Sequence, residues 1–292
     1  MKFQGCWTAL VTPFQKDGGL DEDGFRRLVR HQIKGGVSGL VPCGSTGESA
    51  TLTHDEHRRV IELTLQESQG DVPVMAGIGT NATWKAMELA REAESMGVDA
   101  LLLLAPYYNK PTQEGLFAHF TAVCSRTRLP VMIYNIPGRT GVNVAPATLA
   151  RVAKACPNAV AVKEAAGSLD QVSEIRVKAP KVVVLSGDDS LTVPMMSVGA
   201  KGVVSVLSNA APKLVSSMVD AFLKGKNAQA QALHLKSFPL IKALFAETNP
   251  IPVKAALELM GLCRAEPRLP LTTASAAVRA QLKAELKTLG LL

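Results

Sequence analysis

One pattern of apolar and polar positions recurs along the chain. A short run rich in Val, Leu, Ile or Ala is followed by a turn of small residues and then by an amphipathic stretch. The runs are continuous rather than alternating, which is typical of strands buried on both faces, as in a parallel sheet. Eight such runs predict eight strands: Cys6–Thr12, Gly39–Cys43, Val72–Ile78, Ala100–Ala105, Pro130–Tyr134, Ala159–Val162, Lys181–Leu185 and Gly202–Val206.

Signals for helix starts and ends lie between these runs. Thr53 and Glu56 have the spacing of a capping box, in which each side chain binds the backbone N–H of the other residue. Asp21 and Ser168 are placed to cap further helices, and Pro146 is placed to open one. Glycines that commonly end helices follow the amphipathic stretches, at Gly35, Gly36, Gly97 and Gly199.

The order of these elements predicts the architecture. Strand–helix units that end near Gly225 are compatible with a barrel or a long doubly wound sheet, and a count of eight favours the barrel. Beyond Gly225 only helices are expected, over Asn227–Ala246, Ile251–Met260 and Thr272–Leu289. We therefore expect an α/β protein, a (β/α)8 TIM barrel over residues 1–225 with a C-terminal helical region over residues 226–292.

Composition and charge exclude several classes of protein. The chain has 292 residues, of which 47% are hydrophobic and 20% charged, so it is too apolar to be disordered. Its apolar runs are too short to span a membrane. The net charge of +7 comes from scattered Lys and Arg, and aromatic residues are only 4% of the chain. No basic run or stacking platform indicates nucleic-acid binding, whereas a positive surface can attract small anionic substrates.

Cysteine usage and two local motifs argue against bound metals and nucleotides. The five cysteines are dispersed without a CxxC pair, which favours reduced thiols in a cytoplasm, and the N-terminus lacks the apolar core of a signal peptide. The segment from His54 to His57 is not HExxH and has no evident third ligand. Gly77 to Ala82 fits GxGxxA, but Asp99 precedes the next strand instead of ending it. We expect neither a metal nor a cofactor.

Lys163 stands out among the residues at the strand ends, where barrels carry their chemistry. It follows a buried run, and a partly desolvated amine has a lowered pKa and can form a Schiff base with a ketone. The alternative is a lysine that reaches solvent or pairs with Glu164. Tyr134 could act as an acid or base through Thr46, or be a core tyrosine. Arg139 could bind a carboxylate, or be solvated.

Four motifs, taken together, resemble the dihydrodipicolinate synthases of the N-acetylneuraminate lyase superfamily, and the resemblance covers nearly the whole chain. They are Gly44-Ser45-Thr46-Gly47-Glu48-Ser49, Pro106-Tyr107-Tyr108-Asn109-Lys110-Pro111, Tyr134-Asn135-Ile136-Pro137-Gly138-Arg139-Thr140-Gly141 and Val162-Lys163-Glu164-Ala165. The resemblance implies a (β/α)8 barrel in which pyruvate forms a Schiff base on Lys163 and then attacks L-aspartate-4-semialdehyde. The product would be 4-hydroxy-tetrahydrodipicolinate, in the diaminopimelate route of lysine biosynthesis.

The resemblance also assigns roles to residues at the strand ends. Catalysis would rest on Lys163 together with a proton relay of Thr46, Tyr134 and Tyr108, the last contributed across a dimer interface. Arg139 would bind the semialdehyde's carboxylate. The rest of the substrate site would be formed by Ser45, Thr46, Gly187 and Val204. Members of the family are usually homotetramers built as a dimer of dimers.

Two positions bear on the choice of substrate within the superfamily. Arg139 in its IPGRTG context favours the synthase, because aldolases of sialic acid or sugar acids generally lack arginine there. Ser45 stands where most synthases have threonine, and the Gly-Ser-Thr-Gly-Glu sequence is similar to that of the sialic acid lyases. The alternative is therefore another Schiff-base aldolase of the same superfamily.

A regulatory site is implied by the same resemblance. Lysine-inhibited relatives bind lysine at a dimer interface, through positions that match Ser49, Ala50, His54, His57, Asn81, Lys85 and Tyr107. Lys85 stands where such relatives have a glutamate that meets the ligand's amino group. A cation that faces a cation weakens binding, so we expect lysine inhibition to be weak or absent.

Overall fold

The chain forms two compact units in the computed structural model, which describes all 292 residues. The central unit comprises Met1–Gln4 and Pro73–Val204, and the terminal unit comprises Gly5–Val72 and Ser205–Leu292. Apart from the first four residues, the N-terminal quarter of the chain thus folds together with the C-terminal part, while the middle of the chain forms the other unit.

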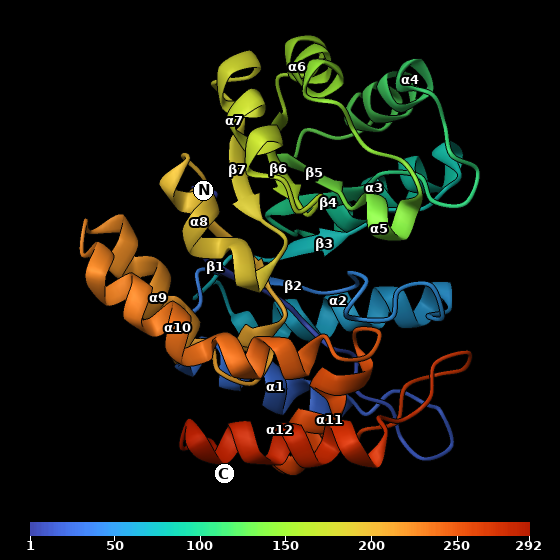
Figure 1. The fold of residues 1–292 in the computed structure, drawn as a ribbon. Helices are drawn as coiled ribbons and strands as arrows, with labels where there is room; N and C mark the ends of the chain where they lie inside the picture. Colours follow the sequence, from blue (N-terminus) through green and yellow to red (C-terminus); the bar gives the residue numbers. More distant parts are fainter. The chain divides into compact units, whose positions relative to one another are not determined.

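The central unit is built on parallel strands in the order β8-β7-β6-β5-β4-β3. These strands are β3 (Met75–Gly77), β4 (Ala100–Leu104), β5 (Val131–Asn135), β6 (Ala159–Glu164), β7 (Val183–Ser186) and β8 (Gly202–Ser205). The central unit ends at Val204 in β8, and the chain continues in the terminal unit from Ser205. Neighbouring helices lie side by side along these strands (Figure 1), in the order α3 (Thr83–Met96), α4 (Gln113–Cys124), α6 (Pro146–Ala155) and α7 (Leu169–Lys178). Short helices α5 (Pro137–Thr140), η1 (Asp189–Leu191) and α8 (Thr192–Ser197) follow strands β5 and β7.

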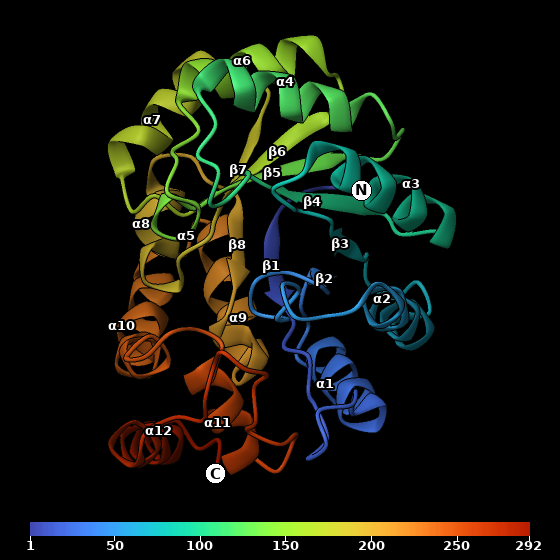
Figure 2. The ribbon, with the colours of Figure 1, turned by 90° about the vertical axis from the view of Figure 1, so that its right-hand side faces the viewer.

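The terminal unit combines the first two strands with the C-terminal helices (Figure 2). Strands β1 (Gly5–Ala9) and β2 (Gly39–Val41) pair in parallel, and they are followed by α1 (Glu22–Lys34) and α2 (His54–Ser68). The last elements of the chain are η2 (Leu207–Asn209), α9 (Pro212–Leu223), α10 (Asn227–Leu244), α11 (Ile251–Leu259) and α12 (Ala276–Thr288). Helix α9 packs on β1, α10 packs on α9, and α12 packs on both α10 and α11.

Local sequence signals account for most of the element boundaries. Each of the eight apolar runs overlaps a strand, and both halves of the capping box between Thr53 and Glu56 are formed. Asp21 and Ser168 cap α1 and α7 as predicted, and Pro146 begins α6. The last helix was predicted too early, because the side chain of Ser275 accepts a hydrogen bond from the N–H of Val278 and fixes the start of α12 at Ala276.

The elements are those of the predicted fold. Eight strands in parallel pairing alternate with helices, and three further helices complete the chain, so the protein is a (β/α)8 barrel with a C-terminal helical segment. The division of that fold into domains at residues 225 and 226 stays a prediction. None of the helices combines the length and the hydrophobicity needed to cross a membrane.

Candidate active site

Lys163 lies near the C-terminal end of β6 as a buried amine without a polar partner. Its residue is only 5% exposed, and it pairs in register with Tyr134 on β5, whose ring centroid lies 4.1 Å from Lys163 Nζ. No hydrogen bond or ion pair engages this amine. Burial lowers the pKa of Lys163 to about 8, although the charges of Asp188 and Asp189 partly oppose this shift. The neutral, nucleophilic fraction near neutral pH is therefore far larger than that of a lysine with the ordinary pKa.

Gly187 leaves room for the side chain of Lys163. A Cβ at this position would lie 2.6 Å from the Cβ of Ala165, closer than real side chains tolerate, and in a tight contact of 3.1 Å with Lys163 Cε. The backbone N–H of Gly187 donates to the carbonyl of Glu164 over 2.7 Å, which fixes the turn after β7 beside β6. Val204, the other predicted lining residue of this unit, is fully buried on β8.

Glu164 does not pair with Lys163, which excludes one alternative interpretation of that lysine. Both oxygens of the buried Glu164 carboxylate accept from Asn135 Nδ2 at 3.1 Å. One of them also accepts from Gln171 Nε2 at 3.0 Å, and the other from the N–H of Ala166 at 2.8 Å. Burial raises the pKa of Glu164, and these hydrogen bonds act in the opposite direction. The carboxylate is thus held by neutral donors beside the strand end.

Arg139 lies on the short helix α5, exposed at the surface of the central unit. Its positive charge contributes to the lowered pKa of Lys163, so the two cations lie within electrostatic reach of each other. The loop is fixed from behind, because Asn135 Oδ1 accepts from the N–H of Val144 at 2.9 Å and Asn135 Nδ2 donates to Asn143 Oδ1 at 2.8 Å. An exposed guanidinium on an anchored loop is suited to bind a carboxylate.

Tyr108 projects from the central unit. The residue is 87% exposed and has a φ of 74°, a left-handed conformation that is rare for residues other than glycine. The next residue, Asn109, donates through Nδ2 to the carbonyl of Asn81 over 3.0 Å, which holds the loop in place. A large aromatic side chain in a fixed but exposed loop has the properties of a contact residue for another molecule.

The turn over residues 44–51 carries Ser45 and Thr46 in the terminal unit. Backbone hydrogen bonds from Gly47 to Gly44 and from Glu48 to Ser45 close it. Thr46 is buried, and its Oγ1 accepts a hydrogen bond from Asn249 Nδ2 over 3.0 Å. The side chain of Ser45 is half-buried and makes no hydrogen bond.

The residues of the predicted regulatory site are divided between the two units. Of these positions, Asn81, Lys85 and Tyr107 belong to the central unit, with Lys85 exposed on α3. Those in the terminal unit are Ser49, Ala50, His54 and His57, of which only His57 is buried.

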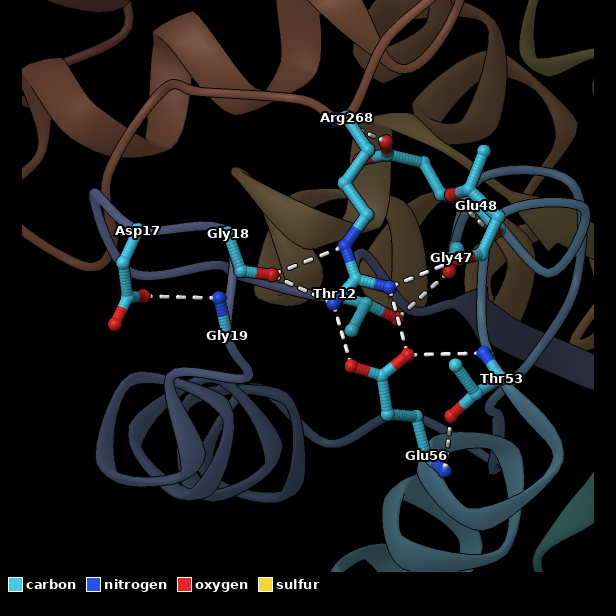
Figure 3. A network of polar contacts seen from close by, with 10 residues as sticks. Thr12, Asp17, Gly18, Gly19, Gly47, Glu48, Thr53, Glu56 and Arg268 are labelled. Carbon is cyan, nitrogen blue, oxygen red and sulfur yellow. Dashed lines mark hydrogen bonds and ion pairs between the residues drawn. The ribbon is translucent and has the colours of Figure 1, made fainter.

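A charged network beside the turn over residues 44–51 includes Glu48, Glu56 and Arg268 (Figure 3). Two of its members come from the C-terminal helical segment. Lys254 on α11 forms an ion pair with Glu48, and both side chains are essentially inaccessible to solvent. The backbone N–H of Arg268 donates to the second oxygen of the Glu48 carboxylate over 2.9 Å. The Arg268 guanidinium donates to Glu56 and to the carbonyls of Gly18 and Thr51.

Sequence reasoning did not find Asn249, Lys254 or Arg268, because their partners lie more than 200 residues away along the chain. One signal was available. Lys254 is the only charged residue in the otherwise apolar segment from Ile251 to Leu257, which is the pattern of a buried and paired lysine. No group of three or more His, Cys, Asp or Glu is arranged to hold a metal ion.

Comparisons with known proteins agree on one family. The model of the dihydrodipicolinate synthetase family matches residues 2–289. A 4-hydroxy-tetrahydrodipicolinate synthase from Pelobacter propionicus is 51% identical over 291 residues, which cover 99% of this chain and 100% of the relative. Among solved structures, a chloride-inhibited dihydrodipicolinate synthase from Acinetobacter baumannii in complex with pyruvate is 41% identical, with a TM-score of 0.97 and full coverage of both chains. A synthase from Cyanidioschyzon merolae with lysine bound is also 41% identical, with a TM-score of 0.96 and 99% coverage of each chain.

The chain therefore belongs to the dihydrodipicolinate synthetase family. Membership confirms the resemblance on which the sequence analysis relied, and with it the barrel fold. The predicted activity, that of a lyase of the 4-hydroxy-tetrahydrodipicolinate synthase type, is likewise confirmed by full-length relatives at about 50% identity.

Proposed function

We propose that this protein condenses pyruvate with L-aspartate-4-semialdehyde to give 4-hydroxy-tetrahydrodipicolinate, in the diaminopimelate route of lysine biosynthesis. The observation that carries the proposal is the amine of Lys163, which is buried, unpaired and lowered in pKa to about 8 in a chain of this family. An amine in this state is suited to attack a ketone. The related synthase that was solved with pyruvate supports the choice of ketone.

The reaction proceeds through a Schiff base on Lys163. The amine adds to the ketone carbon of pyruvate, and loss of water gives an imine. Removal of a proton from the methyl group then gives an enamine, whose carbon attacks the aldehyde of the second substrate. The amino group of that substrate adds to the imine carbon and expels Lys163, which closes the ring and restores the enzyme. None of these steps requires a metal or a cofactor.

The other site residues bind substrates or move protons. Tyr134, Thr46 and Tyr108 carry protons during imine formation and ring closure. Arg139 binds the carboxylate of the semialdehyde, a role suited to its exposed guanidinium. The pyruvate carboxylate binds at the hydroxyls of Ser45 and Thr46, with Gly187 and Val204 lining the site.

The roles of the Ser45 and Thr46 hydroxyls can be distinguished experimentally. The Thr46 oxygen already accepts a hydrogen bond, whereas the half-buried Ser45 hydroxyl makes none. If Thr46 belongs to the relay, Thr46→Val lowers kcat far more than Ser45→Ala does. If Ser45 takes that place, Ser45→Ala has the larger effect on kcat, and Thr46→Val mainly raises the KM for pyruvate.

The decisive experiment is an assay with pyruvate and aspartate semialdehyde, run beside one with N-acetylneuraminate. Turnover of the semialdehyde with trapping of pyruvate on Lys163 by borohydride is expected. Trapping on Lys163 without semialdehyde turnover, but with cleavage of N-acetylneuraminate, would instead identify another aldolase of the superfamily. Trapping on any other residue would overturn the proposed mechanism.

Assembly and location form part of the proposal. We expect a cytoplasmic homotetramer, a dimer of dimers in which each Tyr108 serves the partner's site; its 87% exposure on a fixed loop supports this role. Sedimentation velocity at working enzyme concentration tests the assembly. A fully active monomer would contradict the part assigned to Tyr108 across the interface.

Feedback inhibition by lysine is expected to be weak or absent. A lysine-bound relative shows that members of the family can hold this ligand, but Lys85 places a cation where an anion would favour its amino group. Lys85→Glu should lower the lysine concentration for half-inhibition by about tenfold or more, as one favourable ion pair implies. Strong inhibition of the unmodified protein at sub-millimolar lysine would contradict this expectation.

A further inference from the structure

The hydrogen bond between Asn249 and Thr46 determines what the Thr46 hydroxyl can do. Asn249 Nδ2 donates to Thr46 Oγ1 over 3.0 Å, and the two residues are only 7% and 3% exposed. No other hydrogen bond engages the Thr46 side chain. A hydroxyl has one hydrogen to donate, and an oxygen that already accepts from an amide keeps that hydrogen available for another partner.

We propose that Asn249 is a positioning residue that orients the Thr46 hydroxyl so that it donates its hydrogen to the substrate or to the proton relay. This inference rests on the proposed function, in which Thr46 acts on pyruvate. Asn249 itself touches no reacting atom. It acts through the direction of a single hydrogen bond.

The segment that carries Asn249 is joined to the turn that carries Thr46 by a second buried contact. The residue lies in the short connection between α10 and α11, and α11 begins at Ile251. On the first turn of that helix, Lys254 forms its ion pair with Glu48, which is only two residues beyond Thr46. The start of α11 and the turn that carries Thr46 are therefore joined at two points. Neither segment can shift without breaking a buried contact.

A comparison of two substitutions isolates the direction of this hydrogen bond. Asn249→Ala removes the donor, and the Thr46 hydroxyl keeps its hydrogen free to donate. Asn249→Asp has nearly the shape of asparagine, but its ionised carboxylate can only accept. The Thr46 hydroxyl would then donate to the introduced carboxylate, and its hydrogen would be lost to the reaction. A purely structural role predicts the opposite order, because Asp fills the space and Ala leaves a cavity.

The experiment measures kcat and KM for both variants, with Asn227→Asp, at an exposed residue that begins α10, as a matched control. We expect Asn249→Ala to lower kcat about tenfold and Asn249→Asp about a hundredfold near neutral pH, as expected for loss and for reversal of one oriented hydrogen bond. The Asp variant should recover as the pH falls, since a protonated carboxyl can again donate. The Ala variant should show no such recovery, and Asn227→Asp should behave like the unmodified protein.

The same Asn249 substitutions made in a Thr46→Val variant test whether their effect on kcat depends on the Thr46 hydroxyl. With Thr46→Val already present, neither substitution at Asn249 should lower kcat further, because the hydroxyl that they act on is gone. Circular dichroism and thermal unfolding establish that each variant is folded. An Asp variant at least as active as the Ala variant, or a further loss in the Thr46→Val background, would overturn the proposal.

A failure of the role proposed for Asn249 can be distinguished from a failure of the proposed synthase function. If the unmodified protein does not turn over aspartate semialdehyde, the proposed function fails at its second substrate. The same ranking of Asn249 variants can then be measured in the rate at which borohydride traps pyruvate alone on Lys163. That measurement decides the role of Asn249 without the semialdehyde.

Discussion

The protein contains two buried lysines whose surroundings differ in one decisive respect. Lys163 and Lys254 are 5% and 0% exposed, burial lowers the pKa of both, and each Nζ lies about 4 Å from the centre of an aromatic ring. Lys254 is paired with Glu48 and donates to the carbonyl of Glu266, whereas the amine of Lys163 has no hydrogen-bond partner. A buried amine that is fully paired is structural, and one that is left unpaired is available for chemistry.

The comparison is sharpest when the same substitution is made at both lysines. Lys163→Met should abolish synthase activity, by on the order of 10⁴-fold or more, because no other amine can form the Schiff base. Its free energy of unfolding should stay the same or rise, since an apolar side chain replaces an unpaired cation. Activity is measured with both substrates and stability by urea unfolding. A variant that keeps appreciable turnover would remove Lys163 from the mechanism.

The matching substitution, Lys254→Met, should have the opposite profile. It leaves the buried Glu48 carboxylate without its ion-pair partner, at a cost of about 3–5 kcal/mol in the free energy of unfolding. Trapping of pyruvate on Lys163 should persist in the fraction of the protein that remains folded. The double variant Glu48→Gln with Lys254→Met should regain part of the lost stability. Equal stability of the single variant and the unmodified protein would show that the pair contributes nothing.

The rate at which borohydride traps pyruvate on Lys163 should depend on pH in the way that the lowered pKa of this amine predicts. With a pKa of about 8, the neutral fraction of Lys163 rises about tenfold between pH 7 and pH 9 and then reaches a plateau. An amine with the ordinary pKa of lysine would still be gaining steeply at pH 9. Because the folded state binds fewer protons than the unfolded state between these two pKa values, stability should also rise with pH across that interval.

The smallest expected effect concerns the ion pair between Arg268 and Glu56. The guanidinium of Arg268 lowers the pKa of Glu56 to about 2, so this interaction stabilises the fold above about pH 4.5 and is lost as the pH falls towards 2. Arg268→Lys cannot form the same fork of hydrogen bonds and should cost about 1–2 kcal/mol at neutral pH. Its stability should also fall less steeply below pH 4.5. Unchanged acid unfolding curves would contradict the role given to this pair.

The two lysines also show how far the sequence could predict the molecule. Lys163 was found because a continuous apolar run leads directly to it, and the eight runs of this kind predicted every strand. Local signals of this type depend on neighbours in the chain. Lys254 depends instead on Glu48, 206 residues away, and Asn249 depends on Thr46, 203 residues away. Only the folded chain shows which hydroxyl or carboxylate such residues meet.

In the candidate site too, local sequence predicts some features, whereas others are visible only in the folded chain. Chemical type and position at a strand end were sufficient to choose Lys163, Tyr134 and Arg139 as candidates. They did not show that Glu164 is satisfied by Asn135, Gln171 and a backbone N–H, so that this carboxylate does not pair with Lys163. The reactivity of the lysine thus depends on hydrogen bonds made by its neighbour.

The contact between Arg268 and Gly18 joins residues that are 250 positions apart. During synthesis, the segment around Gly18 leaves the ribosome long before Arg268 has been translated. The turn that carries Ser45 and Thr46 therefore cannot acquire its final support until almost the whole chain is made. A truncated product that ends before residue 268 would retain Lys163 but lack this support, so incomplete chains should be poor catalysts even though they contain the nucleophile.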